Sequence, residues 1–327
     1  MTTAALPARS GPAVRRGLRP RGVTWLTWRQ TRLALLVVTL GYLAALAYLL
    51  YQRHQLDVMQ ARYSGLQCDS TTRGTVSEIV GECGRTGMAL AATANSLHEF
   101  ASYAAVVPGL LGAALAAQPL AADFEHGRHL LLWSQSVSPR RWFTQRLVLP
   151  AAVLVVLSTA LSAAMRWAAF WSHPASSMND LAFAFPSDAM VPVYPLLTLT
   201  AIALGALVGL LWRRVIPALG TTLALYGALL YGIEKVRPYL LPFRRTVFAP
   251  GAMPGDAWAY DFGPVVHGKD LPYSACDHLA CENLSNWTVY HSLSQFGPML
   301  WVETGVLAVL TVGLVALAYR RLLAVTR

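Results

Sequence analysis

The stretch LALLVVTLGYLAALAYLLY, residues 33–51, contains no charged side chain. An α-helix needs about 20 consecutive apolar residues to cross the hydrocarbon core of a bilayer. Five further apolar stretches follow, at residues 100–122, 147–171, 191–212, 215–233 and 299–319. The sequence therefore predicts an all-α polytopic membrane protein with six transmembrane helices.

The composition agrees with a membrane protein, since 55% of the 327 residues are hydrophobic and only 13% are charged. The net charge of +10 would suit a nucleic-acid partner if the basic residues formed one patch. They gather instead in every second gap between the apolar stretches. We therefore expect the lipid bilayer, and no nucleic acid, as the partner of these charges.

The arginines also predict which side of the membrane each gap faces. The gaps that hold them share one side with only two acids, Asp123 and Glu125, and contain 16 of the 26 basic residues, namely Arg9, Arg15, Arg16, Arg19, Arg21, Arg29, Arg32, Arg128, Arg140, Arg141, Arg146, Arg213, Arg214, Arg320, Arg321 and Arg327. Cytoplasmic loops carry the excess of Lys and Arg. Both termini are thus predicted to be cytoplasmic, with the chain in a bacterial plasma membrane.

This orientation divides the chain into alternating segments. Residues 1–32 form a cytoplasmic basic tail that ends in an interfacial helix from Val23, or in a simple extension of the first span. The span 33–51 is too long for the apolar region of a cleaved signal peptide, so we expect it to be retained. The remaining segments are external loops at 52–99, 172–190 and 234–298, a cytoplasmic loop at 123–146, and a cytoplasmic tail at 320–327.

All four cysteines fall in the segments assigned to the outside, where disulfides persist. The local pairing Cys68–Cys83 and Cys276–Cys281 is the one we expect, although four cysteines allow three connectivities. A disulfide-stabilised external loop region would follow from it. Four free thiols remain the alternative, and a zinc site is disfavoured because no Cys-x-x-Cys pair occurs.

Small residues and prolines mark the helices that are expected to pack closely or bend. Gly205 and Gly209 form a GxxxG pattern, and Ala113 with Ala117 forms a looser small-xxx-small pair. Prolines within spans remove a backbone donor, so kinks or helix starts are expected at Pro108, Pro119, Pro150 and Pro217.

Two charged residues lie within apolar stretches, Arg166 in the third and Glu303 in the sixth. A charge at membrane depth is costly unless it is paired, hydrated or able to reach the interface. Each is therefore either an intramembrane polar contact between helices or a side chain that reaches the outer interface.

Motifs for catalysis and for metal binding are weak. Residues 263–270 approach a phosphate-binding loop, but Asp270 follows the lysine where Ser or Thr is required, and Pro272 discourages the helix. Histidines such as His278, near Cys276 and Cys281, could bind zinc or copper, but the spacing of ligands is not that of a known site. We expect no catalytic residue, no bound metal and no cofactor on this chain.

The loop between the second and third spans carries the most specific pattern. It begins with Asp123 and Glu125, continues through the apolar run Leu130–Trp133, and restarts at Ser138-Pro139, which is typical of a helix N-cap followed by proline at the first helical position. The pattern predicts a short helix, a turn, and a helix that enters the membrane. The face of the short helix with Leu131, Leu132 and Trp133 needs a partner, and contact with the bilayer alone is the alternative.

Several short motifs, in order along this frame, resemble those of the ABC-2 type transporter permeases common in high-GC bacteria. They are Trp25-Leu26-Thr27-Trp28-Arg29-Gln30, Glu125-x-Gly127, Trp133-x-Gln135-Ser136-Val137, Arg141-Trp142, Arg237-Pro238-Tyr239-Leu240, Tyr290-His291, Ser294-Gln295-Phe296 and Trp301-Val302-Glu303. The motifs touch both ends and the middle, so the resemblance covers nearly the whole chain.

The resemblance implies an ABC-2 (type V exporter-like) architecture, with a permease that dimerises with a second protomer, identical or not. ATP and magnesium would be bound by separate ABC ATPase subunits, and this chain would not hydrolyse ATP itself. The loop after the second span resembles the coupling helix that docks into the ATPase, which implies coupling roles for Glu125, Gly127, Trp133, Gln135 and Arg141. Arg128 and Pro139 depart from the family's usual residues.

The function expected from these patterns is ATP-driven export of a hydrophobic or amphipathic cargo, such as a lipid, a peptide or a drug-like metabolite, by alternating access. The apolar spans lack a ladder of acids or histidines, which disfavours an ion pump. One alternative is a membrane sensor or immunity subunit that binds an external peptide or antibiotic. Another is a membrane enzyme that uses external histidines or acids.

Overall fold

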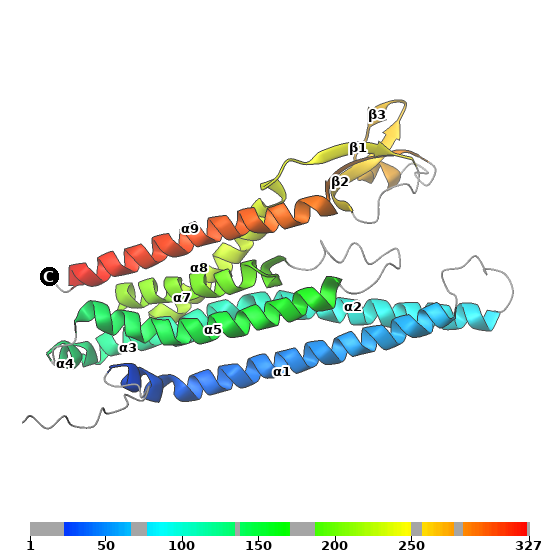
Figure 1. Cartoon of the computed structure of the whole chain (residues 1–327). Coiled ribbons are helices and arrows are strands. Elements are labelled where there is room, and N and C mark those ends of the chain that lie inside the picture. Colours follow the sequence, from blue (N-terminus) through cyan, green and yellow to red (C-terminus); the bar gives the residue numbers. More distant parts are fainter. Residues whose placement is uncertain are drawn as a thin grey trace, which may run out of the picture.

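Long helices run side by side in one bundle, with a small sheet at one end and two short helices, α3 and α4, at the other (Figure 1). The computed structural model describes residues 23–66, 77–134, 138–170, 187–249, 257–277 and 284–325. The helices are α1 (Val23–Gly65), α2 (Ser77–Gly112), the π-helical turn η1 (Ala113–Ala117), α3 (Gln118–Glu125), α4 (Arg128–Ser134), α5 (Pro139–Phe170), η2 (Ser187–Ala189), α7 (Val193–Trp212), α8 (Val215–Val236), η3 (Arg237–Tyr239), η4 (Tyr273–Asp277) and α9 (Leu293–Val325).

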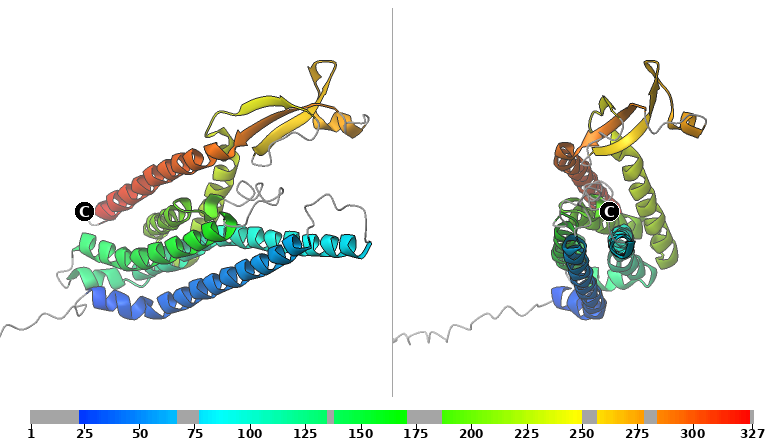
Figure 2. Two further views of the ribbon diagram at one scale, coloured as in Figure 1. Left: turned by 45° about the vertical axis from the view of Figure 1, so that its right-hand side comes forward. Right: turned by 90° about the vertical axis from the view of Figure 1, so that its right-hand side faces the viewer.

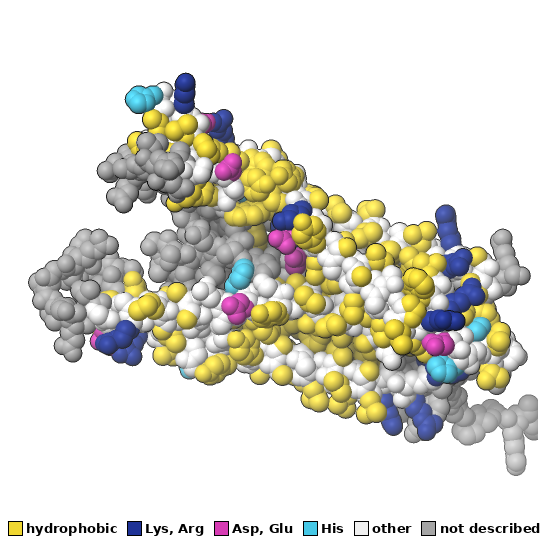
Figure 3. Space-filling view, turned by 180° about the vertical axis from the view of Figure 1, so that it is seen from behind, with side chains coloured by type: hydrophobic (Ala, Val, Ile, Leu, Met, Phe, Trp, Pro, Cys, Tyr) yellow, Lys and Arg dark blue, Asp and Glu magenta, His cyan; other side chains and the backbone are white. Residues whose placement is uncertain are grey.

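Within the described part of the chain, six helical segments are long and apolar enough to cross a membrane. They are Trp28–Gly65, Gly81–Glu125, Pro139–Ala168, Val193–Trp212, Val215–Tyr239 and Ser294–Val325. Hydrophobic side chains cover the middle of the bundle surface, and many of the basic side chains gather at the end that holds α3 and α4 (Figure 3). The prediction of a polytopic membrane protein with six membrane-spanning helices is confirmed.

Helices α1 and α2 extend well past the predicted membrane boundaries. A helix of 43 residues such as α1 is about 65 Å long, roughly twice the hydrocarbon thickness. The two extensions are joined by polar contacts, in which Arg62 pairs with Glu82 and Gln52 donates to Ser96 Oγ at 2.8 Å. Most of segment 52–99 is therefore helical. The polar residues of this segment continue α1 and α2 beyond the apolar stretches, and each extension is stabilised by contacts with the other. The start of α1 at Val23 also makes residues 23–32 an extension of the first span.

The second span changes its helical pitch near its proline. The π-helical turn η1 lies directly before Pro119, which cannot donate a hydrogen bond to the preceding turn. The predicted irregularity at Pro119 is thus present as a π-helical turn. Helix α2 continues through Pro108, and helix α5 continues through Pro150. Pro217 lies in the first turn of α8.

Helix α7 is the centre of the bundle. About 78% of its apolar window is buried, compared with 17% for α1, α8 and α9. Its backbone packs directly against the backbone around η1, with no room for a side chain at Gly205 or Gly209. A Cβ added to Gly205 would lie 2.3 Å from Gly112 O, and a Cβ added to Gly209 would lie 2.8 Å from Ala117 O. The predicted GxxxG pattern and the small residues of the second span therefore form one helix–helix contact.

The segment between α8 and α9 is a sheet, so the fold is mostly helical and the all-α prediction is wrong for this part. The four strands are β1 (Arg244–Phe248), β2 (Ala257–Val266), β3 (Lys269–Asp270) and β4 (Asn286–Ser292). They pair antiparallel in the order β1-β4-β2-β3. The sheet stands beyond the ends of α8 and α9 (Figure 2). Strands form here because β-branched and aromatic residues dominate β1 and β4.

The sequence that resembled a phosphate-binding loop is a β-hairpin. Strands β2 and β3 are joined by His267 and Gly268, whose φ angles are +49° and +74°. Two successive positive φ values are typical of a type I′ hairpin turn, which glycine favours. A strand rather than a helix follows the turn, so the interpretation of this motif as a chance match is confirmed.

Candidate functional site

Helices α3 and α4 meet at a sharp bend, which we call the elbow (residues 118–134). Helix α3 ends at Glu125, and Gly127 follows with φ of +66°, a left-handed conformation that favours glycine at a helix end. Gly127 N donates to Phe124 O at 3.2 Å, and Leu130 N donates to Gly127 O at 3.1 Å. The predicted short helix is α4. The bend at Gly127 that separates it from α3 was not predicted, and the predicted turn between α4 and α5 lies mostly outside the described residues.

Helix α5 begins directly after the elbow. Pro139 is its first residue, and Arg141 N donates to Ser138 Oγ at 3.4 Å. The predicted N-cap at Ser138 is confirmed, since its hydroxyl accepts from a backbone group of the first turn that has no partner within the helix.

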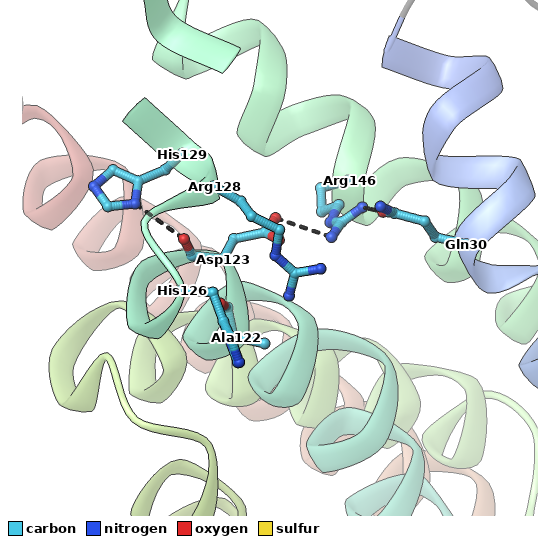
Figure 4. A network of polar contacts seen from close by, with 7 residues as sticks. All are labelled: Gln30, Ala122, Asp123, His126, Arg128, His129 and Arg146. Atoms are coloured by element: carbon cyan, nitrogen blue, oxygen red, sulfur yellow. Dashed lines mark hydrogen bonds and ion pairs between the residues drawn. The ribbon is translucent and has the colours of Figure 1, made fainter. Parts of the chain in front are cut away.

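A buried acid ties the elbow to the rest of the bundle (Figure 4). Asp123 Oδ2 accepts from Arg146 Nη2 of α5 at 2.9 Å, and Asp123 Oδ1 lies 3.4 Å from Arg128 Nε of α4. Arg146 also donates to the side-chain oxygen of Gln30 in α1. The side chains of Asp123 and Arg146 are only 3% and 7% exposed. A single carboxylate therefore joins α3, α4 and α5, and through Arg146 the first span.

Aromatic side chains form the inward face of α4. Phe124 lies 4.4 Å from His129, His129 lies 5.0 Å from Trp133, and Trp133 lies 6.1 Å from Trp142, measured between ring centroids. The guanidinium of Arg213, at the end of α7, lies 5.7 Å from the Phe124 ring centroid. Helix α4 is therefore packed through its aromatic side onto α3, α5 and the end of α7.

The opposite side of α4 is exposed and apolar. Leu130 and Leu131 are 62% and 67% exposed, and Arg140 and Arg141 are exposed at the start of α5. Two adjacent exposed leucines on a short helix form an apolar patch of the kind that proteins use for contact with another protein.

Glu125 connects the elbow to α8. Its Oε2 accepts from Val215 N at 2.8 Å, and Val215 is the first residue of α8. Arg214, which precedes it, provides no side-chain cap. The carboxylate of Glu125 thus satisfies a free backbone donor and interacts favourably with the positive end of the helix dipole.

The predicted coupling residues are partly brought together. Glu125, Gly127 and Trp133 lie in the elbow, and Arg141 lies one turn into α5, while Gln135 is outside the described residues. Glu125 and Trp133 face the chain's own helices, so their predicted role in contact with a partner would be indirect. The structure adds Leu130 and Leu131 as the residues that face outward.

A second buried ion cluster lies at the opposite end of the bundle. Arg237 Nη2 lies 3.0 Å from Glu303 Oε1, Arg237 Nε donates to Glu303 Oε2 at 3.2 Å, and Arg237 also pairs with Asp188. The Glu303 side chain is 3% exposed. Of the two interpretations of Glu303, a contact between helices is the one observed, and its partner is Arg237. Arg166 is exposed near the end of α5.

Motifs that are 53 and 66 positions apart meet around this cluster. His291 Nε2 lies 2.9 Å from Pro238 O, and Gln295 Nε2 donates to Pro242 O at 3.0 Å. The segment after α8 is thus fastened to the start of α9. Sequence reasoning missed Arg237 and Asp188 as partners of Glu303, although a buried acid requires a cation and Arg237 was already part of a recognised motif.

The sheet presents an aromatic surface next to this cluster. Tyr239, Tyr260, Phe262 and Tyr273 are all exposed, and the hydroxyls of Tyr239 and Tyr260 lie 2.7 Å apart. The hydrogen bond to Tyr239 raises the pKa of Tyr260.

Two of the four cysteines lie in the described residues. Cys83 and Cys276 each take part in a disulfide bond, whereas Cys68 and Cys281 lie outside the described residues, so the predicted pairing remains a prediction. Across the described ranges, His, Cys, Asp and Glu form no group of three that could hold a metal ion. His278 lies outside them.

A comparison with known families identifies a match. The model of a family described as ABC-2 membrane transporter related matches residues 22–237, about two thirds of the chain, from the start of α1 to the end of α8. No curated protein and no solved structure matches the chain.

Proposed function

Because the chain belongs to the ABC-2 membrane transporter related family, we propose that it is the permease subunit of an ATP-driven exporter. The cargo in this proposal is hydrophobic or amphipathic, such as a lipid, a peptide or a drug-like metabolite. Separate ABC ATPase subunits bind ATP and magnesium, and two permease protomers form the route.

The observation that carries the proposal is the two-sided construction of α4. Its aromatic side and Asp123 hold it to α3 and α5, and its other side exposes Leu130 and Leu131. A rigidly held helix with an exposed apolar surface is suited to transmit movement from a docked ATPase into the bundle.

Three connections would carry that movement. The Asp123–Arg146 pair leads to α5 and, through Gln30, to α1. Glu125 leads to the start of α8. The close contact of Gly205 with Gly112 leads to α7. Each joins the elbow or the second span to another membrane-spanning helix, so a displacement of α4 would reach most of the bundle.

The second and fifth spans would open the route, as in alternating access. Tyr226 of α8 donates its hydroxyl to Ala105 O at 2.9 Å, and a Cβ on Gly109 would lie 2.4 Å from the Tyr226 ring. ATP binding supplies the difference in affinity between the inward and outward states that transport requires. Both termini and the elbow are cytoplasmic in this proposal, because the basic residues gather there.

The test is retention of an ATPase by the exposed face of α4. The full chain is expressed with a candidate ATPase, purified, and assayed for bound ATPase and for hydrolysis in nanodiscs. The double change Leu130→Ser with Leu131→Ser should weaken ATPase retention roughly a hundredfold or more, since each buried leucine contributes about 1.5–3 kcal/mol.

Leu317→Ser is the control, because Leu317 is a leucine on α9, outside the elbow, that is 51% exposed. If both variants retain the ATPase as the unchanged chain does, the exposed face of α4 is not a docking surface and the coupling proposal fails.

The sensor alternative is favoured by one feature, the exposed aromatic surface of Tyr239, Tyr260, Phe262 and Tyr273. Aromatic residues are enriched at surfaces that bind peptides and proteins. An external peptide that binds the purified chain without changing hydrolysis by the associated ATPase would support a sensor over an exporter.

A further inference from the structure

A polar pocket of about 370 Å³ lies beside the elbow, between α1, the second span and α5. Its polar wall includes Gln30, Thr31, Gln118, Arg128 and Arg146. Figure 4 shows Arg128 and Arg146 approaching Asp123 from α4 and α5, with Gln30 on the side of α1. The pocket is separate from the exposed leucines of α4.

The charge of this pocket is positive. Two guanidinium groups share the single carboxylate of Asp123, which leaves one positive charge without a compensating acid in that network. The Arg128 side chain is 47% exposed, so it can reach a ligand. Arg146 Nε is buried and has no hydrogen-bond partner among the described residues. Gln30 accepts from Arg146 through its oxygen, so its amide nitrogen can still donate.

The remaining wall of this pocket is apolar and includes Ala34 and Leu115. One turn further along α1, a second pocket of about 320 Å³ lies between Val38, Gly41, Val107 and Leu111. Residues spaced by three or four lie on one face of a helix, so Gln30, Ala34, Val38 and Gly41 line one seam. The seam is polar and cationic at the end of the spans and apolar toward their middle.

We propose that this seam binds one anionic phospholipid. Its phosphate lies between Arg128 and Arg146 with Gln30, Thr31 and Gln118 as further hydrogen-bonding groups, and an acyl chain lies along the apolar part of the seam toward Val38 and Leu111. Basic pockets between membrane helices on the cytoplasmic side suit anionic headgroups, and an adjoining apolar surface distinguishes a lipid from a free anion. The lipid would link α1 to the elbow, whatever the cargo of the transporter. This inference does not rest on the proposed function.

The experiment measures lipid retention by the purified full chain in detergent, using native mass spectrometry. The probes are phosphatidylglycerol, phosphatidylcholine with the same acyl chains, and glycerol 3-phosphate. The chain should retain phosphatidylglycerol in preference to the other two. Arg128→Gln should lower its retention about fivefold, the effect of one basic residue near a lipid headgroup.

Two matched controls separate the site from general charge and bulk. Arg140→Gln removes an exposed arginine at the same end of α5, and it should leave retention unchanged. Ala34→Phe fills the seam and should also lower retention, whereas Ala47→Phe, at an exposed position elsewhere on α1, should not.

Equal retention of phosphatidylglycerol and phosphatidylcholine would overturn the proposal. So would glycerol 3-phosphate that binds as well as the lipid, because a free anion would then suffice. An equal effect of Arg128→Gln and Arg140→Gln would also overturn it. If Arg128→Gln does not fold, the pair Ala34→Phe and Ala47→Phe decides the question.

Discussion

At the residue scale, Asp123 is the buried carboxylate that ties the elbow to α5. It is a buried acid whose two oxygens face arginines from different helices. Removing one partner of a buried ion pair costs far more than the pair itself contributes, because the remaining charge is left without compensation. The elbow therefore depends on this carboxylate for its position.

Asp123→Asn should lower the free energy of unfolding by about 3 kcal/mol, measured by SDS-induced unfolding in mixed micelles. Glu82→Gln is the matched control. Glu82 pairs with Arg62, whose side chain is 65% exposed, so the loss of this pair should cost about 1 kcal/mol or less. Equal effects of the two changes would show that the elbow network adds no stability.

The cluster of Arg237, Asp188 and Glu303 gives a second test at this scale. Arg237→Gln leaves two nearly buried carboxylates without a cation, whereas Glu303→Gln leaves Arg237 paired with Asp188. We expect Arg237→Gln to destabilise the protein by about 3 kcal/mol or more, and Glu303→Gln to have a clearly smaller effect. Thermal unfolding in detergent measures both, and the reverse order would contradict the arrangement of the cluster.

At the element scale, the contact between α7 and the second span sets the packing of the bundle. It depends on the absence of side chains at Gly205 and Gly209, which lets the two backbones touch. The π-helical turn η1 of the second span lies at this contact, so the regular helix α7 packs against an irregular turn there.

Gly205→Ala should destabilise the protein by about 1–3 kcal/mol, because its Cβ would lie 2.3 Å from a backbone oxygen and the helices must separate. Gly220→Ala is the matched control. Gly220 lies in α8 with no atom within 4 Å of its Cβ position, so the change should be neutral or stabilising by up to about 1 kcal/mol. Thermal unfolding of both variants in the same detergent measures the difference. Similar stability for both would mean that α7 does not pack on η1.

At the scale of the whole molecule, the two ends of the bundle differ in character. One end holds the elbow and many of the arginines, and the other holds the sheet (Figures 1 and 3). The proposed orientation requires the first to be cytoplasmic and the second external.

Single cysteines at two exposed positions test that orientation in intact cells. Val247→Cys in the sheet should react with a membrane-impermeant maleimide, and Leu131→Cys in the elbow should react only after permeabilisation. Labelling of Leu131→Cys alone in intact cells would mean that the elbow faces outward, where no ATPase could reach it.

Much of the fold could be predicted from the sequence. Apolar stretches predicted six spans because the requirement for about 20 apolar residues is local. The short helix α4 and the start of α5 could be predicted from the apolar run Leu130–Trp133 and from Ser138 with Pro139, since caps depend on neighbouring residues. The bend at Gly127 was not predicted. The sheet was missed although β1 and β4 contain strand-forming residues, because the two strands pair across a long connection that neither strand alone records.

The sequence by itself determined that the chain lies in a membrane, how often it can cross the membrane, and to which family it belongs. The length of the apolar stretches, the distribution of charge and the order of the motifs are properties of the linear sequence and do not depend on contacts between distant residues. Only the tertiary structure decided which charges are paired and which surfaces are free. Asp123 meets Arg146 and Glu303 meets Arg237 across 23 and 66 positions. Those partners are chosen by how helices pack in space, and the packing leaves Leu130 and Leu131 exposed while it buries the aromatic side of the same helix.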